Sequence, residues 1–172
     1  WFISDEIYHG LSFGKPATTA LATSQDAIVI NSFSKYFSMT GWRVGWLVVP
    51  QDLVAAFERL AQNLFICAPA VSQAAALGAF DGREELEENV ARYARNRAFL
   101  MGNLPNVGFS ELVPADGGFY LYADVSRFTD DSLAFSREML EAAGVALARL
   151  LDPCQARAQR LRCLALHPGI QC

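Results

Sequence analysis

The spacing of hydrophobic positions changes along the chain, from continuous apolar runs in the first part to a helical period later. Three apolar runs of strand length lie at residues 1–6, 27–35 and 42–50. Runs of this kind, rich in Val and Ile, are typical of strands that are buried on both faces of a sheet. We therefore expect three strands, each of the first two ending in polar residues.

From residue 51 onward the apolar positions recur with the period of a helix. Residues 51–63 place their apolar side chains on one face, at Leu53, Val54, Phe57, Leu60 and Ala61. A second helix is expected from Ala70 to about Phe80. The longest is expected from about Glu84 to Asn103, where acidic residues at the start suit a helix N-terminus.

The remaining pattern predicts a strand in "GGFYLYADV", a helix in "DSLAFSREMLEAAG" that ends at Gly144, and a strand in "VALA". This order of elements predicts an α/β domain that leads into a smaller α+β domain. We place the large domain at 1–80, a small domain with its linking long helix at 81–148, and a tail of different character at 149–172.

Composition narrows the function classes. With 172 residues, 52% of them hydrophobic, the chain can bury a sizeable core. The net charge of −4 argues against nucleic acid or an anionic membrane as the main partner. No apolar run is long enough to span a bilayer, and we interpret the protein as cytoplasmic. The chain opens on "WFISDE" without an initiator methionine, so we expect residues to precede it.

Two histidines and four cysteines without a CxxC pair do not support a metal site, and we expect no metal. Gly10 and Gly14 before Lys15 could suggest a phosphate loop. The glycine spacing is too short for one, and Pro16 stands where a metal-binding Ser or Thr is required. We therefore reject the phosphate-loop interpretation.

Polar residues cluster where the predicted strands end. They are Asp5, Tyr8, Ser32, Ser34, Lys35 and Arg43. In open α/β sheets, ligands bind at the carboxyl ends of strands, so these groups could converge on one crevice. A lysine in such a place loses its proton readily and forms a Schiff base with an aldehyde. Pyridoxal phosphate offers the aldehyde, and it needs a carboxylate for its ring nitrogen and an arginine with hydroxyls for its phosphate.

These motifs resemble those of the fold-type I aminotransferases of class I/II. The resemblance rests on "SDEIY", on "SFSK" with Lys35 thirty residues after Asp5, and on Arg43 eight residues after Lys35. It continues through "GWRVGWLVVP" and "GGFYLYADV" and covers about residues 1–148. It implies a PLP-transferase-like α/β fold, with part of the large, mainly parallel-sheet domain and a small α+β C-terminal domain.

The resemblance also implies roles for single residues. Lys35 would carry pyridoxal 5'-phosphate as a Schiff base and move the α-proton of the substrate. Asp5 would pair with the pyridinium nitrogen, and Tyr8 would contact the phenolic oxygen. Beside them Glu6 is expected to be solvated or structural, and His9 to pack or to make a loop hydrogen bond.

The phosphate of the cofactor would be held by Ser32 and Arg43 according to the same resemblance. Ser34 would either bind the phosphate too or shape the turn. The aromatic residues nearby, Tyr36, Phe37, Trp42 and Trp46, are expected in the core or in an interface.

The activity that the resemblance implies is the transfer of an amino group between an L-amino acid and a 2-oxo acid, in a protein that is a homodimer when intact. Two alternatives stay open. One is a PLP-dependent carbon–sulfur lyase or synthase of the same fold. The other is an inactive fragment, because the motifs correspond to only the C-terminal part of such an enzyme.

The tail after Ala148 combines several arginines with three cysteines. It could form a basic amphipathic helix, or it could be the product of a shifted reading frame in a GC-rich gene. The family carries an arginine for the substrate carboxylate in a pattern R-x-S-[FY]. Arg162 falls near the expected distance, but "RCLAL" does not match that pattern, so we expect its position to be a coincidence.

Overall fold

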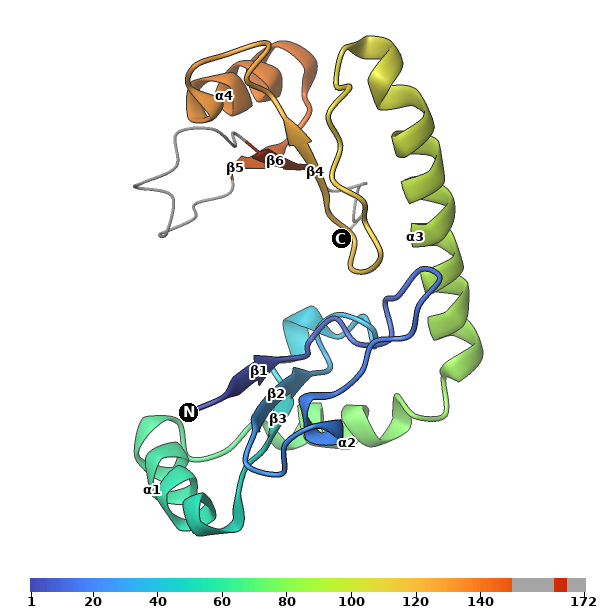
Figure 1. Ribbon diagram of the computed structural model, residues 1–172. Helices are drawn as coiled ribbons and strands as arrows, with labels where there is room; N and C mark the ends of the chain where they lie inside the picture. Colours follow the sequence, from blue (N-terminus) through green and yellow to red (C-terminus); the bar gives the residue numbers. More distant parts are fainter. Residues whose placement is uncertain (150–162, 167–172) are drawn as a thin grey trace. The chain divides into compact units, whose positions relative to one another are not determined.

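A computed structural model describes residues 1–149 and 163–166 of the chain (Figure 1). The chain divides into two compact units, Trp1–Val90 and Ala91–Cys172, and the division falls within the long helix α3 (Arg83–Asn103). Each unit has its own three-stranded sheet. The domain bounds predicted near residues 80 and 148 remain predictions.

The sheet of the first unit consists of β1 (Ile3–Asp5), β2 (Ile28–Ser32) and β3 (Gly45–Val48), in that order. β1 and β2 are parallel, whereas β3 runs antiparallel to β2. Because of these directions, the carboxyl ends of β1 and β2 and the start of β3 lie at one edge of the sheet (Figure 1).

The helices of the first unit follow the sheet in sequence. A 3-10 turn, η3 (Gln51–Leu53), leads into α1 (Val54–Leu64), and α2 (Ala70–Gly78) follows. The predicted helices are confirmed, except that the first three residues of the helix predicted at 51–63 form the 3-10 turn η3. In the part of the chain that the structure describes, no helix is both long and apolar enough to cross a membrane.

Two small cores hold the first unit together. Phe33, Met39 and Ala76 form one of them, so α2 packs against the segment that follows β2. The other joins Val29 and Ala27 to Ala20, which lies in the 3-10 turn η1 (Ala20–Ala22). The loop between β1 and β2 is therefore anchored to the sheet, and the segment after β2 is anchored to α2.

The three strands differ in their burial. Ile28 and Val29 of β2 are buried, as the apolar pattern predicts. On β3, however, the side chains of Trp46, Leu47 and Val48 are 38–48% exposed. Within the described residues α1 buries none of its side chains, and a pocket of about 570 Å³ lies between β3 and α1. The expectation of burial on both faces therefore holds for β2 and fails for β3, and it also fails for β1, where Ile3 is 58% exposed.

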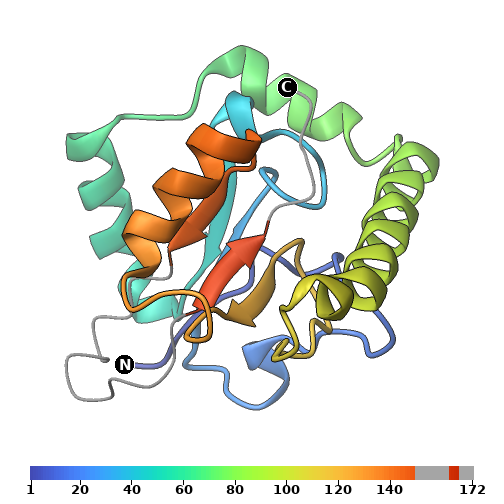
Figure 2. The same ribbon diagram turned by 90° about the horizontal axis from the view of Figure 1, so that it is seen from above.

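The second unit contains the end of α3, the 3-10 turn η4 (Leu104–Val107), β4 (Leu121–Asp124), α4 (Ser132–Ala143), β5 (Leu147–Arg149) and β6 (Cys163–Leu166). Its sheet has the order β4-β6-β5 with antiparallel pairs. Figure 2 shows α4 along one face of this sheet. Phe109, Ala123 and Val125 form its core, and Phe135 of α4 packs on them.

One strand of this sheet comes from the tail at 149–172. Leu166 pairs with Leu121 of β4 and with Leu147 of β5, so Cys163–Leu166 is a strand and the helix considered for this stretch is wrong there. The rest of the tail, including Arg162, lies outside the described residues. The reading-frame hypothesis and the interpretation of Arg162 therefore remain untested.

Candidate functional site

Three of the predicted site residues are placed at one edge of the first sheet by its topology. Asp5 is the last residue of β1, and Ser32 is the last residue of β2. Ser32 pairs across the register with Gly45, only two positions after Arg43. The antiparallel return of β3 therefore brings Arg43 back to the edge at which β1 and β2 end.

Lys35 lies in a turn that spans residues 32–39, called the lysine turn below. The Ser34 N–H donates to Ser32 Oγ at 2.9 Å, and the two serine hydroxyl oxygens are 2.8 Å apart. The turn closes where the Ser38 N–H donates to the carbonyl of Lys35 at 3.0 Å. Ser32 and Ser34 thus shape the turn themselves, through their own hydroxyl groups.

Lys35 and Tyr8 come together in space although 27 positions separate them. The Nζ atom of Lys35 lies 5.7 Å from the centroid of the Tyr8 ring, a distance at which a cation is attracted to an aromatic face. Both side chains are half-buried. This contact joins the loop after β1 to the turn after β2.

Asp5 and Arg43 are exposed and make hydrogen bonds within their own turns. The Ile7 N–H donates to Asp5 Oδ1 at 3.2 Å. The guanidinium of Arg43 donates to the carbonyl of Thr40 at 2.8 Å, and its backbone has a φ of 53°. A left-handed conformation is uncommon for a residue with a side chain, and it often marks a functional position.

Glu6 is the buried carboxylate of this region, with only 4% of its surface exposed. It accepts hydrogen bonds from the Ala20 N–H at 2.7 Å and from the Thr19 and Ser4 hydroxyls, and His9 Nδ1 lies 3.3 Å away. Burial alone would raise the pKa of Glu6, but these donors and His9 together hold it below its usual value. Of the two alternatives for Glu6, the contacts support the structural one.

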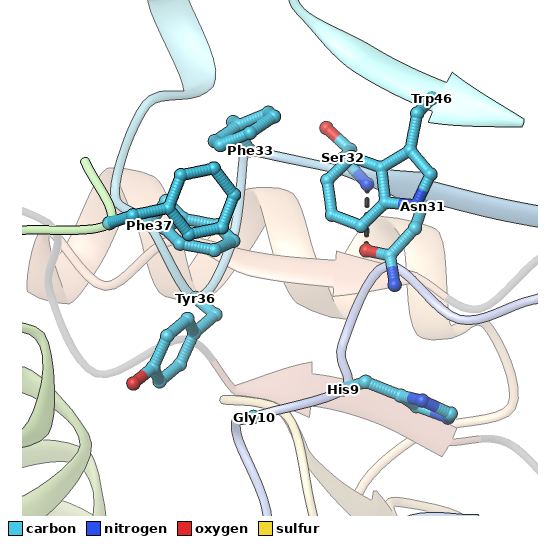
Figure 3. A pocket seen from close by; sticks show the side chains of 9 residues that line it. His9, Gly10, Asn31, Ser32, Phe33, Tyr36, Phe37 and Trp46 are labelled. Carbon is cyan, nitrogen blue, oxygen red and sulfur yellow. Dashed lines mark hydrogen bonds between the residues drawn. The ribbon is translucent and has the colours of Figure 1, made fainter. Parts of the chain in front are cut away.

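An aromatic pocket of about 540 Å³ lies next to the lysine turn (Figure 3). Figure 3 shows His9 and Gly10 on one side, Tyr36 and Phe37 on another, and Trp46 beside Asn31. The full lining is His9, Gly10, Asn31, Ser32, Phe33, Tyr36, Phe37, Trp46 and Phe80. The pocket shares Ser32 with the predicted site residues, and its aromatic walls were expected only as core or interface residues.

Tyr36 makes a contact that the sequence did not indicate. Its hydroxyl donates to Glu87 Oε1 at 2.6 Å, across 51 positions of sequence. Burial, the hydrogen bond to Glu87 and its charge raise the pKa of Tyr36. No spacing or motif connects the two residues, so only the folded structure identifies the pair.

The groups at this edge match the chemistry that pyridoxal phosphate requires. An amine at Lys35 can bond the aldehyde, and a carboxylate at Asp5 can pair with a ring nitrogen. The hydroxyls of Ser32 and Ser34 are donors that suit a phosphate, and so is the guanidinium of Arg43, which lies two positions before the residue paired with Ser32. The residues present therefore fit this cofactor.

Comparisons with known proteins agree with this chemistry. The family "aminotransferase class I and II" matches residues 1–167. A valine–pyruvate aminotransferase of Mycobacterium tuberculosis is 51% identical over 154 residues, which are 87% of this chain and 40% of that protein. The family match extends to residue 167, into the tail that the sequence analysis set apart.

Two solved structures have a closely similar fold. A protein of Silicibacter pomeroyi assigned to the aminotransferases has a TM-score of 0.87 and 52% identity, over 97% of this chain and 45% of its own. An aminotransferase from Mycobacterium tuberculosis has a TM-score of 0.86 and 48% identity, over 95% and 43%. The chain thus spans less than half the length of each of the three proteins named here.

Proposed function

Because the chain belongs to the class I and II aminotransferase family, we propose that the whole protein is a PLP-dependent transaminase in which Lys35 holds the cofactor. The observation that supports this best is the position of the Lys35 amine over the Tyr8 ring, at the edge where β1 and β2 end. When bound, pyridoxal phosphate supplies an electron sink that stabilises negative charge at the substrate α-carbon.

Each residue at this edge has a proposed task. Lys35 Nζ would hold the cofactor, and its amine would move the α-proton of the substrate as general base and acid. Asp5 would keep the ring nitrogen protonated, and Tyr8 would donate a hydrogen bond to the phenolic oxygen. Ser32 and Arg43 would hold the phosphate. Ser34 takes part in the phosphate site through its hydroxyl, which already contacts Ser32.

The proposed substrates are an L-amino acid and a 2-oxo acid. The relative from Mycobacterium tuberculosis named above acts on valine and pyruvate by its name, so we propose this pair first. The aromatic pocket beside Ser32 supports an apolar side chain on the amino acid. The family resemblance further supports a homodimer, and we propose a cytoplasmic location where free amino acids are available.

Amino transfer itself tests this proposal. The whole protein, supplied with pyridoxal phosphate, valine and pyruvate, is expected to form alanine and 3-methyl-2-oxobutanoate in equal amounts. Lys35→Ala removes the amine and is expected to abolish the reaction, whereas Lys15→Ala is expected to keep it. Release of ammonia instead of alanine would favour the lyase alternative. Product from the whole protein but none from the 172-residue chain would favour the inactive fragment.

A further inference from the structure

Tyr36 follows Lys35 directly in the sequence. Its side chain contacts Glu87, whereas that of Lys35 contacts Tyr8. We propose that Tyr36 is a positioning residue, whose hydrogen bond to Glu87 holds the lysine turn in the place where Lys35 meets Tyr8. This inference deepens the proposed function, because it assigns Tyr36 a role in placing Lys35, beyond lining the aromatic pocket.

The hydrogen bond between Tyr36 and Glu87 is short and charge-assisted. Its oxygen atoms lie 2.6 Å apart, within the range of bonds between a hydroxyl and a carboxylate. Glu87 lies in the part of α3 that belongs to the first unit. Burial and the neighbouring carboxylate raise the pKa of Tyr36 above its ordinary value of 10.0, although Arg83 opposes this, so the hydroxyl is a donor at neutral pH.

A second contact joins the same helix to the same turn. The side-chain amide of Asn89 donates to the Ser38 hydroxyl oxygen at 3.4 Å. Ser38 is also the residue whose N–H closes the turn on the carbonyl of Lys35. Helix α3 therefore holds the lysine turn at two points, Tyr36 and Ser38, just after the lysine.

The ring of Tyr36 also supports the loop that carries Tyr8. A Cβ atom placed on Gly10 would lie 2.6 Å from Cδ2 and 2.7 Å from Cγ of Tyr36, so the backbone of this loop rests directly on the ring. Tyr36 thus touches both segments that meet at the Lys35–Tyr8 contact. Its hydroxyl fixes one side of the ring to Glu87, and its face fixes the position of the loop.

The two lysines of the chain allow a test that needs no cofactor. They are Lys15, which is exposed, and Lys35, which is half-buried. In the cofactor-free 172-residue chain, a limiting amount of acetic anhydride is allowed to compete for both amines, and peptide mass spectrometry gives the ratio of labelling at Lys35 to that at Lys15. We expect Lys35 to label more slowly than Lys15, because the lysine turn holds it against Tyr8.

Four variants separate positioning from general stability. Tyr36→Phe keeps the ring and removes the donor, and it is expected to raise the labelling ratio about tenfold, the size expected for losing a hydrogen bond to a charged group. Glu87→Ala is expected to raise the labelling ratio by the same factor. The double variant Tyr36→Phe with Glu87→Ala is expected to raise it no further, because both changes remove the same hydrogen bond. Glu87→Gln keeps an acceptor oxygen and is expected to restore most of the wild-type ratio. Tyr93→Phe makes the same chemical change elsewhere on α3 and is expected to change nothing.

Circular dichroism at the labelling temperature shows whether each variant is folded. An unchanged ratio in folded Tyr36→Phe and Glu87→Ala overturns the inference, and so does a wild-type chain in which both lysines label equally. A structural role alone would lower the melting temperature without altering the ratio. Borohydride trapping with pyridoxal phosphate is read separately: a wild-type chain with no cofactor on Lys35 contradicts the proposed function, whatever the acetylation ratio is.

Discussion

At the residue scale, Glu6 is the most buried charged residue of the first unit. It accepts hydrogen bonds from one backbone N–H and two hydroxyls and lies beside His9. Glu6→Gln replaces one acceptor oxygen by an NH₂ group, which is itself a donor and cannot accept these hydrogen bonds. We expect it to lower the free energy of unfolding by about 1–3 kcal/mol, measured by urea denaturation at neutral pH.

The same carboxylate makes stability depend on pH. Its folded-state pKa lies below the ordinary value of 4.5, so its stabilising contribution is complete above that value and is lost as the pH falls through the lowered folded pKa. The wild type should therefore lose more stability than Glu6→Gln as the pH is lowered from neutral to below 4.5. Parallel curves for the two proteins would show that Glu6 is not the group responsible.

Gly10 offers a second test at this scale. Its φ is +94°, and a methyl group there would overlap the ring of Tyr36. Gly14→Ala is a matched control, because its φ is +99° but no atom lies within 4 Å of the added carbon. We expect Gly10→Ala to lower the melting temperature clearly more than Gly14→Ala, with an additional cost of about 1–3 kcal/mol from the overlap. Equal losses would mean that backbone strain alone decides the outcome.

The sequence indicated positions along the strands better than contacts between distant residues. The places of lysine, aspartate and arginine near strand ends could be predicted, because an apolar run followed by polar residues is a local pattern, whereas their roles toward a cofactor stay predictions. The aromatic pocket and the bond from Tyr36 to Glu87 could not be predicted, since they join residues far apart in the chain through contacts that no local pattern encodes. Gly10 was considered only for a phosphate loop, whereas the structure shows it packed against a ring.

At the element scale, helix α4 shows how local signals define both ends of a helix. The carboxylate of Asp131 accepts hydrogen bonds from the Leu133 and Ala134 N–H groups, and Gly144 ends the helix with a φ of 66°. Asp131→Ala removes the cap and is expected to cost about 1 kcal/mol of stability in thermal unfolding. Glu138→Gln, an exposed change on the same helix, should cost much less, and equal losses would contradict the capping role.

The helices were predicted closely because their apolar period is a local property. The strands were harder in two places. The tail gave no clear strand signal, yet Cys163–Leu166 pairs between β4 and β5, because pairing with two existing strands outweighs weak local preference. The apolar run of β3 predicted burial, but its side chains are exposed, since burial depends on what packs against a strand.

At the scale of the whole molecule, large apolar side chains gather on the surface near the end of α1. Leu64, Phe65 and Ile66 are 63–78% exposed. Exposed apolar patches favour association, so we expect the chain to self-associate in light-scattering measurements. Leu64→Lys should reduce this association, whereas Leu140→Lys, a similar change on α4, should not. Equal effects of the two changes would show that the region near α1 has no special part in it.

The central claim is that Lys35 is the residue that holds pyridoxal phosphate. The most direct measurement is to add the cofactor to the 172-residue chain, reduce with borohydride, and map the modified lysine by peptide mass spectrometry. Because Lys15 and Lys35 are the only lysines in the sequence, the peptide map separates the predicted lysine from a single control lysine and from the N-terminal amine. We predict one cofactor per chain on Lys35. Modification of Lys15 and Lys35 to the same extent, or of neither, would contradict the claim.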